Sequence, residues 1–217
     1  MEYAPFSPLD LENCARACEL HGMGSIAKVD FQNRGYVAQK ALASGIQGIL
    51  FTDCLNAAEV EECIYLTMPG TPSDGGRFGY PYSRWIGCYP DIPQLDHASR
   101  VRDAVRLFMI EKKSAYDEIE TICKLPGVDM IQFGPSDFSL SMGLNTSDNK
   151  IVWEAQDRCI RIAMENGVRP RVEIYSPEEA RRFLDMGVKD FCIGDQVDGL
   201  INYWQGLGDG LASLMKE

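Results

Sequence analysis

The chain has 217 residues, of which 45% are hydrophobic and 24% are charged, and this composition is typical of a globular protein rather than a disordered one. Its formal net charge of −11 argues against a nucleic-acid partner or an anionic membrane surface, because such a protein repels phosphate groups. The sequence shows neither a run of about 18 apolar residues that could span a bilayer nor the basic start and apolar run of a signal peptide.

Short apolar runs alternate with helical segments along the whole chain. Runs this short and this rich in apolar residues are typical of parallel strands that are covered on both faces. The helical segments start at capping residues such as Ser7, Asn56 and Ser176, each followed three residues later by an acidic residue. Glycines follow the helical patterns as stop signals. The predicted strands are residues 24–29, 48–53, 105–111, 128–134, 171–175 and 190–194.

Six β–α repeats without a break in composition predict a single α/β domain over residues 1–217 with a parallel sheet. An open doubly wound sheet and a (β/α) barrel are the two architectures to weigh. No GxGxxG follows the first strand, which disfavours a dinucleotide-binding fold, whereas a closed barrel needs eight strands. Residues 69–97 are rich in Gly, Pro and aromatic side chains and predict a long loop, either a binding lid or an oligomer contact.

Eight cysteines are scattered along the chain without a CxxC pair. Most of them stand among apolar neighbours, including Cys14, Cys54 and Cys192, which is the pattern of buried, reduced thiols. The sequence therefore predicts a cytoplasmic protein without a cysteine metal cluster.

Two acidic residues, Glu111 and Asp137, each follow an apolar run, and one βα unit separates them. They are therefore expected at the same end of neighbouring strands, where carboxylates repel one another unless a cation intervenes. Hard ions such as Mg²⁺ are often held by one or two carboxylates, with substrate oxygens completing the shell. The alternative is structural: Glu111 pairs with Lys112 or Lys113, and Asp137 caps a short helix. Spacing alone favours this alternative.

The sequence around Glu111 and Asp137 resembles that of a known protein family. Residues 108–143, FMIEKKSAYDEIETICKLPGVDMIQFGPSDFSLSMG, resemble the core signature of the HpcH/HpaI aldolase and citrate lyase family. The resemblance extends to residues 2–23, 41–51, 76–85 and 178–196, and so covers nearly the whole chain.

This resemblance implies a TIM-type (β/α)8 barrel of the phosphoenolpyruvate/pyruvate-domain type. The family has a first βα unit and a second strand before the segment that resembles residues 2–23, so one or two strands are expected to be missing here and the natural chain to be longer. The implied activity is the metal-dependent cleavage of a 4-hydroxy-2-oxo acid to pyruvate, or a related 2-oxo acid, and an aldehyde. Homo-oligomers, trimers or hexamers, are also implied.

The resemblance assigns roles to particular residues. Glu111 and Asp137 become the protein ligands of a divalent ion, Mg²⁺, Mn²⁺ or Co²⁺. The loop of Gly134, Pro135, Ser136 and Asp137 is expected to hold the carboxylate of the 2-oxo acid through its backbone.

Several positions depart from the family pattern. Tyr3 replaces a histidine that assists proton transfer. Lys28 replaces an arginine beside the enolate oxygen, which keeps the positive charge but loses the bidentate geometry of a guanidinium. Met109 replaces a glutamine, and Asp53 adds an acid at the mouth of the site. His21 and His97 are expected at the surface.

Two alternatives remain open at this point. Lys28 could act as a Schiff-base nucleophile, as in metal-free aldolases. The chain could also be a non-catalytic relative that binds a 2-oxo acid or a partner subunit.

Overall fold

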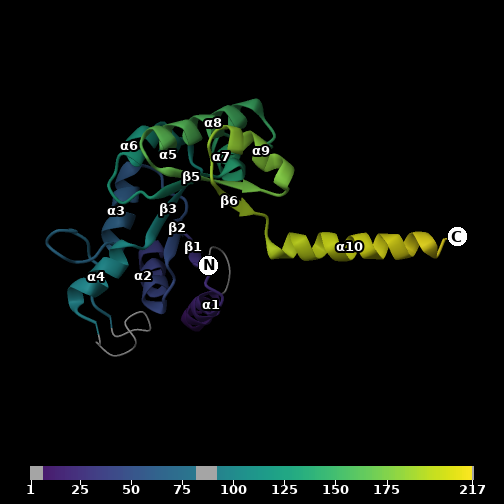
Figure 1. Ribbon diagram of the computed structural model, residues 1–217. Coiled ribbons are helices and arrows are strands. Elements are labelled where there is room, and N and C mark those ends of the chain that lie inside the picture. Colours follow the sequence, from purple (N-terminus) through teal and green to yellow (C-terminus); the bar gives the residue numbers. More distant parts are fainter. Residues whose placement is uncertain (1–6, 82–91, 217) are drawn as a thin grey trace. The chain divides into compact units, whose positions relative to one another are not determined.

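The structure is a computed structural model that describes residues 7–81 and 92–216 (Figure 1). It divides into two compact units, Met1–Pro170 and Arg171–Glu217. The single domain over residues 1–217 therefore stays a prediction.

The first unit is an alternation of strands and helices. Its elements are α1 (Pro8–Leu20), β1 (Ile26–Val29), α2 (Arg34–Ser44), β2 (Gly48–Phe51), α3 (Ala57–Thr67), α4 (Gln94–Arg102), β3 (Val105–Ile110), α5 (Lys113–Asp117), α6 (Ile119–Cys123), β4 (Met130–Phe133), α7 (Pro135–Ser141), α8 (Lys150–Glu165) and the start of β5 (Arg169–Ile174). The second unit holds the rest of β5, α9 (Pro177–Asp185), β6 (Asp190–Ile193) and α10 (Gln196–Leu214).

All six predicted strands form, and β5 begins two residues earlier than predicted. The predicted loop over residues 69–97 is partly wrong, because α4 begins at Gln94. The seven cysteines in the described ranges are all free, as predicted. Their burial was overestimated, since Cys14 is exposed and Cys192 is only half-buried.

The strands of the first unit pair in the order in which they occur in the chain. β1 pairs with β2, β2 with β3 and β3 with β4, all in parallel, and in the second unit β5 and β6 are also parallel. The strand order does not reverse within the first unit, whereas a doubly wound sheet reverses its order at the point where ligands bind.

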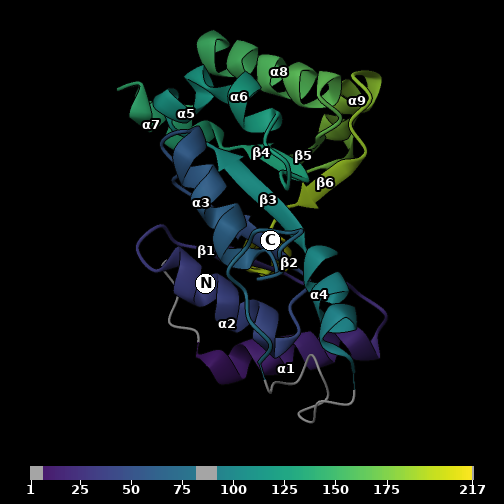
Figure 2. The same ribbon diagram turned by 90° about the vertical axis from the view of Figure 1, so that its left-hand side faces the viewer.

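The two faces of β1–β4 are covered differently. Every helix of the first unit contributes side chains to one large apolar cluster, shared with strand residues such as Phe51, Phe108 and Ile131. The other face carries a separate cluster made by strand residues only: Leu50, Val105, Leu107, Met109 and Met130. Helices α1, α2, α3, α6 and α8 contact one another in succession along the helical face (Figure 2). A single helical layer outside sequentially ordered parallel strands is the arrangement of a (β/α) barrel, and β1–β4 have the arrangement of part of one.

Local signals in the sequence explain where the helices begin and end. The side chains of Ser7, Asn56 and Ser176 each accept a hydrogen bond from the backbone N–H three residues ahead, as predicted. Gly45 ends α2 with a left-handed φ of 98°, a conformation that a residue with a Cβ adopts only at a cost.

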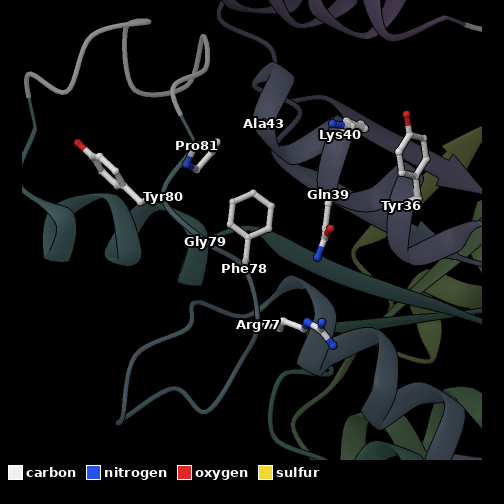
Figure 3. A pocket seen from close by; sticks show the side chains of 9 residues that line it. All are labelled: Tyr36, Gln39, Lys40, Ala43, Arg77, Phe78, Gly79, Tyr80 and Pro81. Atoms are coloured by element: carbon white, nitrogen blue, oxygen red, sulfur yellow. The ribbon is translucent and has the colours of Figure 1, made fainter.

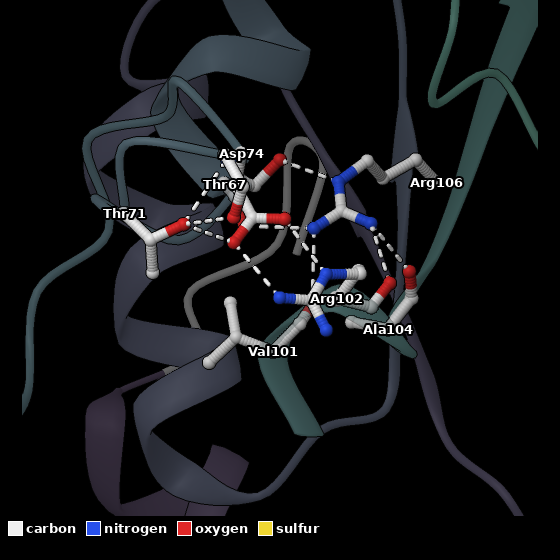
Figure 4. Close-up of polar contacts among 8 residues, drawn as sticks. Thr67, Thr71, Asp74, Val101, Arg102, Ala104 and Arg106 are labelled. Atoms are coloured by element: carbon white, nitrogen blue, oxygen red, sulfur yellow. Dashed lines mark hydrogen bonds and ion pairs between the residues drawn. The ribbon is translucent and has the colours of Figure 1, made fainter. Parts of the chain in front are cut away.

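Arg106, the second residue of β3, is the centre of a network of polar contacts (Figure 4). Its side chain is 2% exposed, and its guanidinium donates to Thr67 Oγ1 and to the carbonyls of Thr67, Val101, Arg102 and Ala104. A fixed positive charge therefore lies against the carboxyl ends of α3 and α4, where the helix dipole favours a cation. Burial lowers the pKa of Arg106.

Helix α10 differs from every other helix, because none of its residues is buried. Its exposed apolar side chains include Leu200, Tyr203, Trp204, Leu207 and Leu211. In the described part of the chain no helix is both long and apolar enough to cross a membrane.

Candidate active site at the carboxyl edge of the strands

Glu111 stands directly after β3 and is 2% exposed. Its Oε1 accepts a 2.7 Å hydrogen bond from the backbone N–H of Asp53, which follows β2. On its other side lies Gly134: a Cβ at that position would come within 2.8 Å of Glu111 Cβ and 2.9 Å of its Oε2. The glycine is therefore required because the buried carboxylate occupies the space that a side chain would need.

The buried position changes the acidity of Glu111. Desolvation, together with the negative charges of Asp53 and Asp137, raises the pKa of this carboxyl to about 7. The Asp53 N–H and the positive charge of Lys28 act in the opposite direction and lower the pKa. In the absence of a cation, a proton is thus retained near neutral pH.

Asp137 lies in the first turn of α7 and its side chain is 52% exposed. The segment that carries it is tied to β3, because the backbone N–H of Gly134 donates to the carbonyl of Ile110 at 3.1 Å. Since Asp137 contributes to the raised pKa of Glu111, the two carboxylates share one edge of the sheet. Pro135 and Ser136 begin the helix, and the first N–H groups of a helix have no intrahelical acceptor.

Lys112 links two acids of this edge. Its Nζ lies 2.6 Å from Asp53 Oδ1 and 3.9 Å from Asp137 Oδ1. Asp53 has a φ of 56°, the one left-handed φ outside glycine in the described ranges. Its Oδ2 is buried and has no hydrogen-bond partner. The structural alternative is wrong for both lysines, because Lys112 pairs with Asp53 and Lys113 with Asp117.

Lys28 is half-buried in the middle of β1, opposite Leu50 in the parallel register. Leu50 belongs to the strand-only cluster, so Lys28 shares the face that the helices do not cover. Its positive charge lowers the pKa of Glu111. Tyr3, the other predicted catalytic residue, lies outside the described residues.

The donor set of this edge suits a hard divalent ion. Two further carboxylates, Asp53 and Asp137, lie close enough to Glu111 to raise its pKa, and Lys112 pairs with both of them. Oδ1 of Asp30, directly after β1, is also buried without a partner. Within the described ranges no group of three or more His, Cys, Asp or Glu side chains is arranged to hold a metal, so a site here would rest on two carboxylates and ligand oxygens.

The histidines lie elsewhere. His21 ends α1 and is exposed, as expected. The prediction for His97 is wrong: it is 3% exposed, because it packs edge-on against Tyr80 at 5.0 Å and its Nε2 lies 3.2 Å from the carbonyl oxygen of Gly79. Neither histidine is among the residues of the carboxyl edge.

The sequence does not predict the ion pair of Lys112 with Asp53. The spacing identifies Asp53 as an added acid, but it does not indicate the left-handed φ of Asp53 or the closeness of the two side chains.

Comparison with known proteins identifies relatives of the chain. Hydroxypyruvate/pyruvate aldolase of Paraburkholderia phytofirmans is 24% identical over 206 residues, covering 91% of this chain and 76% of the relative. The 4-hydroxy-2-oxo-heptane-1,7-dioate aldolase of Escherichia coli is 28% identical over 160 residues, covering 72% of this chain. The chain spans only 59% of that relative's length.

The fold is shared with solved structures. The HpcH/HpaI aldolase from Desulfitobacterium hafniense superposes with a TM-score of 0.85 at 19% identity, covering 100% of this chain and 82% of that one. Residues 11–199 match the family described as HpcH/HpaI aldolase/citrate lyase. The chain belongs to the HpcH/HpaI aldolase/citrate lyase family.

Proposed function

We propose that the chain cleaves a 4-hydroxy-2-oxo acid into pyruvate, or a related 2-oxo acid, and an aldehyde, with a divalent ion as cofactor. The observation that carries the proposal is the buried carboxylate of Glu111, fixed by the Asp53 N–H and packed against Gly134 at the edge that also holds Asp137. In a family of aldolases and citrate lyases, this edge is where barrel chemistry is expected.

Glu111 and Asp137 would hold Mg²⁺ or a similar ion, which supplies positive charge beside the 2-oxo group. The backbone N–H groups of Ser136 and Asp137, at the start of α7, would hold the substrate carboxylate. Lys28 offers a second positive charge to the oxygen that becomes negative when the carbon–carbon bond breaks. Lys112, held by Asp53, keeps its ammonium beside Asp137.

Cleavage is tested by incubating the protein with a 4-hydroxy-2-oxo acid and Mg²⁺ or Mn²⁺ and measuring 2-oxo acid release. Glu111→Gln should abolish release, because the amide cannot serve as an anionic ligand. Glu120→Gln is the matched control, since Glu120 is an exposed acid that pairs with Arg158 on the helical side. Full activity of Glu111→Gln would contradict the proposal.

A Schiff-base mechanism at Lys28 is the competing chemistry. Borohydride reduction in the presence of pyruvate and a chelator would attach the 2-oxo acid covalently to Lys28 if that mechanism operated. We expect no adduct in the mass spectrum. A stable adduct at Lys28 would replace the metal-assisted proposal.

A non-catalytic, ligand-binding role is the second candidate function. The Asp53–Lys112 ion pair favours it, because Asp53 is an acid that the family pattern lacks and the pair stands at the mouth of the site. Pyruvate or oxalate that raises the melting temperature with Mg²⁺, without turnover of any 4-hydroxy-2-oxo acid, would support this role.

We also propose that the chain is a homo-oligomer. Helix α10 buries no residue, although it carries a series of large apolar side chains, and such a face needs a partner surface. A second copy of this chain is the proposed partner.

A further inference from the structure

A cavity of about 480 Å³ lies between α2 and the facing residues 77–81 (Figure 3). Helix α2 supplies Tyr36, Gln39 and Lys40 to its wall, and the facing segment supplies Arg77, Phe78 and Tyr80. The volume falls in the range of sites that bind small molecules. None of the residues of the carboxyl edge lines this cavity, so it is separate from the candidate active site.

The facing segment is held firmly by backbone hydrogen bonds. The N–H of Arg77 donates to the carbonyl of Tyr65 at 2.8 Å, and the N–H of Phe78 donates to Met68 at 2.9 Å. Phe78 is 6% exposed and packs into the large apolar cluster. His97 adds a contact from α4, because its ring meets the edge of Tyr80. The cavity wall is therefore largely preformed, which reduces the ordering cost of binding a ligand.

The charge of the cavity is opposite to that of the protein. Lys40 and Arg77 both line it, and among the described lining residues there is no acidic side chain. Neither residue forms an ion pair with any other residue in the described ranges, although the chain has a formal net charge of −11. Lys40 instead lies over the ring of Tyr36, with its Nζ 5.5 Å from the ring centroid. Two unneutralised cations in an acidic protein make this cavity attractive to an anion.

The aromatic walls restrict the anion further. Tyr36 and Phe78 give the cavity ring surfaces that favour a flat apolar group, whereas the ring of Tyr80 turns toward His97 and its hydroxyl donates to the carbonyl of Ile92. The guanidinium of Arg77 can bind a carboxylate through two parallel hydrogen bonds, and Lys40 adds a second positive charge. We propose that this cavity is a binding site for a small aromatic carboxylate.

Calorimetric titration of the full chain with benzoate tests the proposal. We expect saturable binding in the millimolar range or tighter, with acetate and benzyl alcohol at least about tenfold weaker, because each lacks one of the two recognised groups. Lys40→Gln combined with Arg77→Gln should weaken benzoate binding at least about tenfold. The matched control is Lys124→Gln with Arg161→Gln, which removes two exposed charges elsewhere and should bind like the wild type.

Several outcomes would overturn the site. Benzoate that fails to bind at about 10 mM, or acetate that binds as tightly as benzoate, would exclude recognition of an aromatic carboxylate. An equal loss in the control pair would show a general charge effect. Thermal melting of each variant verifies folding, and the titration needs no metal or turnover, so its result is independent of the proposed lyase activity.

Discussion

The backbone N–H of Asp53 donates a 2.7 Å hydrogen bond to the carboxylate of Glu111, joining the ends of β2 and β3. This contact leaves the second oxygen of Glu111 beside Gly134, at the edge that also carries Asp137. The carboxylate is thus fixed in position although burial opposes its ionisation.

The first prediction concerns pH and stability without metal. The pKa of Glu111 is raised from 4.5 to about 7 in the folded protein, so the fold favours the neutral acid. The contribution of the Glu111 carboxyl to the stability of the fold is complete below pH 4.5 and is lost as the pH rises through 7. With EDTA present, Glu111→Gln should therefore be more stable than wild type at pH 8.5, by up to about 3 kcal/mol, and similar to it at pH 4.

Urea unfolding at both pH values measures this difference. Addition of Mg²⁺ at pH 8.5 should reverse the order, because the ion stabilises only the ionised wild-type carboxylate. The account of Glu111 is wrong if the stability difference between the two proteins is the same at both pH values.

The second prediction uses the space beside Glu111. Gly134→Ala places a methyl group 2.9 Å from Glu111 Oε2 and from Met109 Cε, so the carboxylate must move. The overpacking should cost about 1–3 kcal/mol of stability and should remove the Mg²⁺-induced rise in melting temperature. Gly79→Ala is the control, because a Cβ there meets no atom within 4 Å. Retention of the Mg²⁺ effect in Gly134→Ala would show that Glu111 can shift without consequence.

The third prediction concerns the Asp53–Lys112 ion pair. Asp53→Asn should release the Lys112 ammonium, which then pairs with Asp137 and competes with the metal there. We expect Mg²⁺ affinity to fall about tenfold, a change of about 1.4 kcal/mol. Adding Lys112→Met should restore most of the affinity, and the double-mutant cycle isolates this coupling. Strictly additive effects of the two substitutions would refute it.

The fourth prediction tests the buried guanidinium of Arg106. Arg106→Met leaves the carbonyls of Thr67, Val101 and Ala104 without their donor, so the free energy of unfolding should fall by about 2–4 kcal/mol. Arg102→Met should have a far smaller effect, because Arg102 pairs with Asp74 at the surface. Equal losses in the two variants would contradict a special role for the buried arginine.

The fifth prediction concerns α10. Leu207→Asp puts a charge in the middle of its exposed apolar side chains and should dissociate the proposed oligomer. Light scattering behind size exclusion measures the mass. Asp209→Asn, a neighbouring change that adds no charge, serves as the control. A wild-type protein that is monomeric at micromolar concentration would rule out the proposed assembly.

Much of the fold could be predicted, because the pattern that forms the strands is local. Apolar runs such as residues 105–111 are continuous in the chain, and the caps at Ser7 and Ser176 act within three residues. Glu111 and Asp137 were predicted as neighbours because parallel strands joined by one helix place their carboxyl ends at one edge.

Other features depend on contacts that spacing does not encode. The Asp53–Lys112 pair accompanies a left-handed φ at Asp53, a conformation that residues other than glycine adopt only occasionally. His97 is buried because the segment containing Gly79 and Tyr80 folds back onto α4, a contact between parts of the chain that no periodicity links.

The central claim is that Glu111 and Asp137 jointly bind a divalent ion. Mn²⁺ titration followed by electron paramagnetic resonance measures the free ion directly and needs no catalytic turnover. We expect one site per chain in the wild type, and a loss of affinity of at least about tenfold in both Glu111→Gln and Asp137→Asn. Unchanged Mn²⁺ affinity in either variant would contradict the claim.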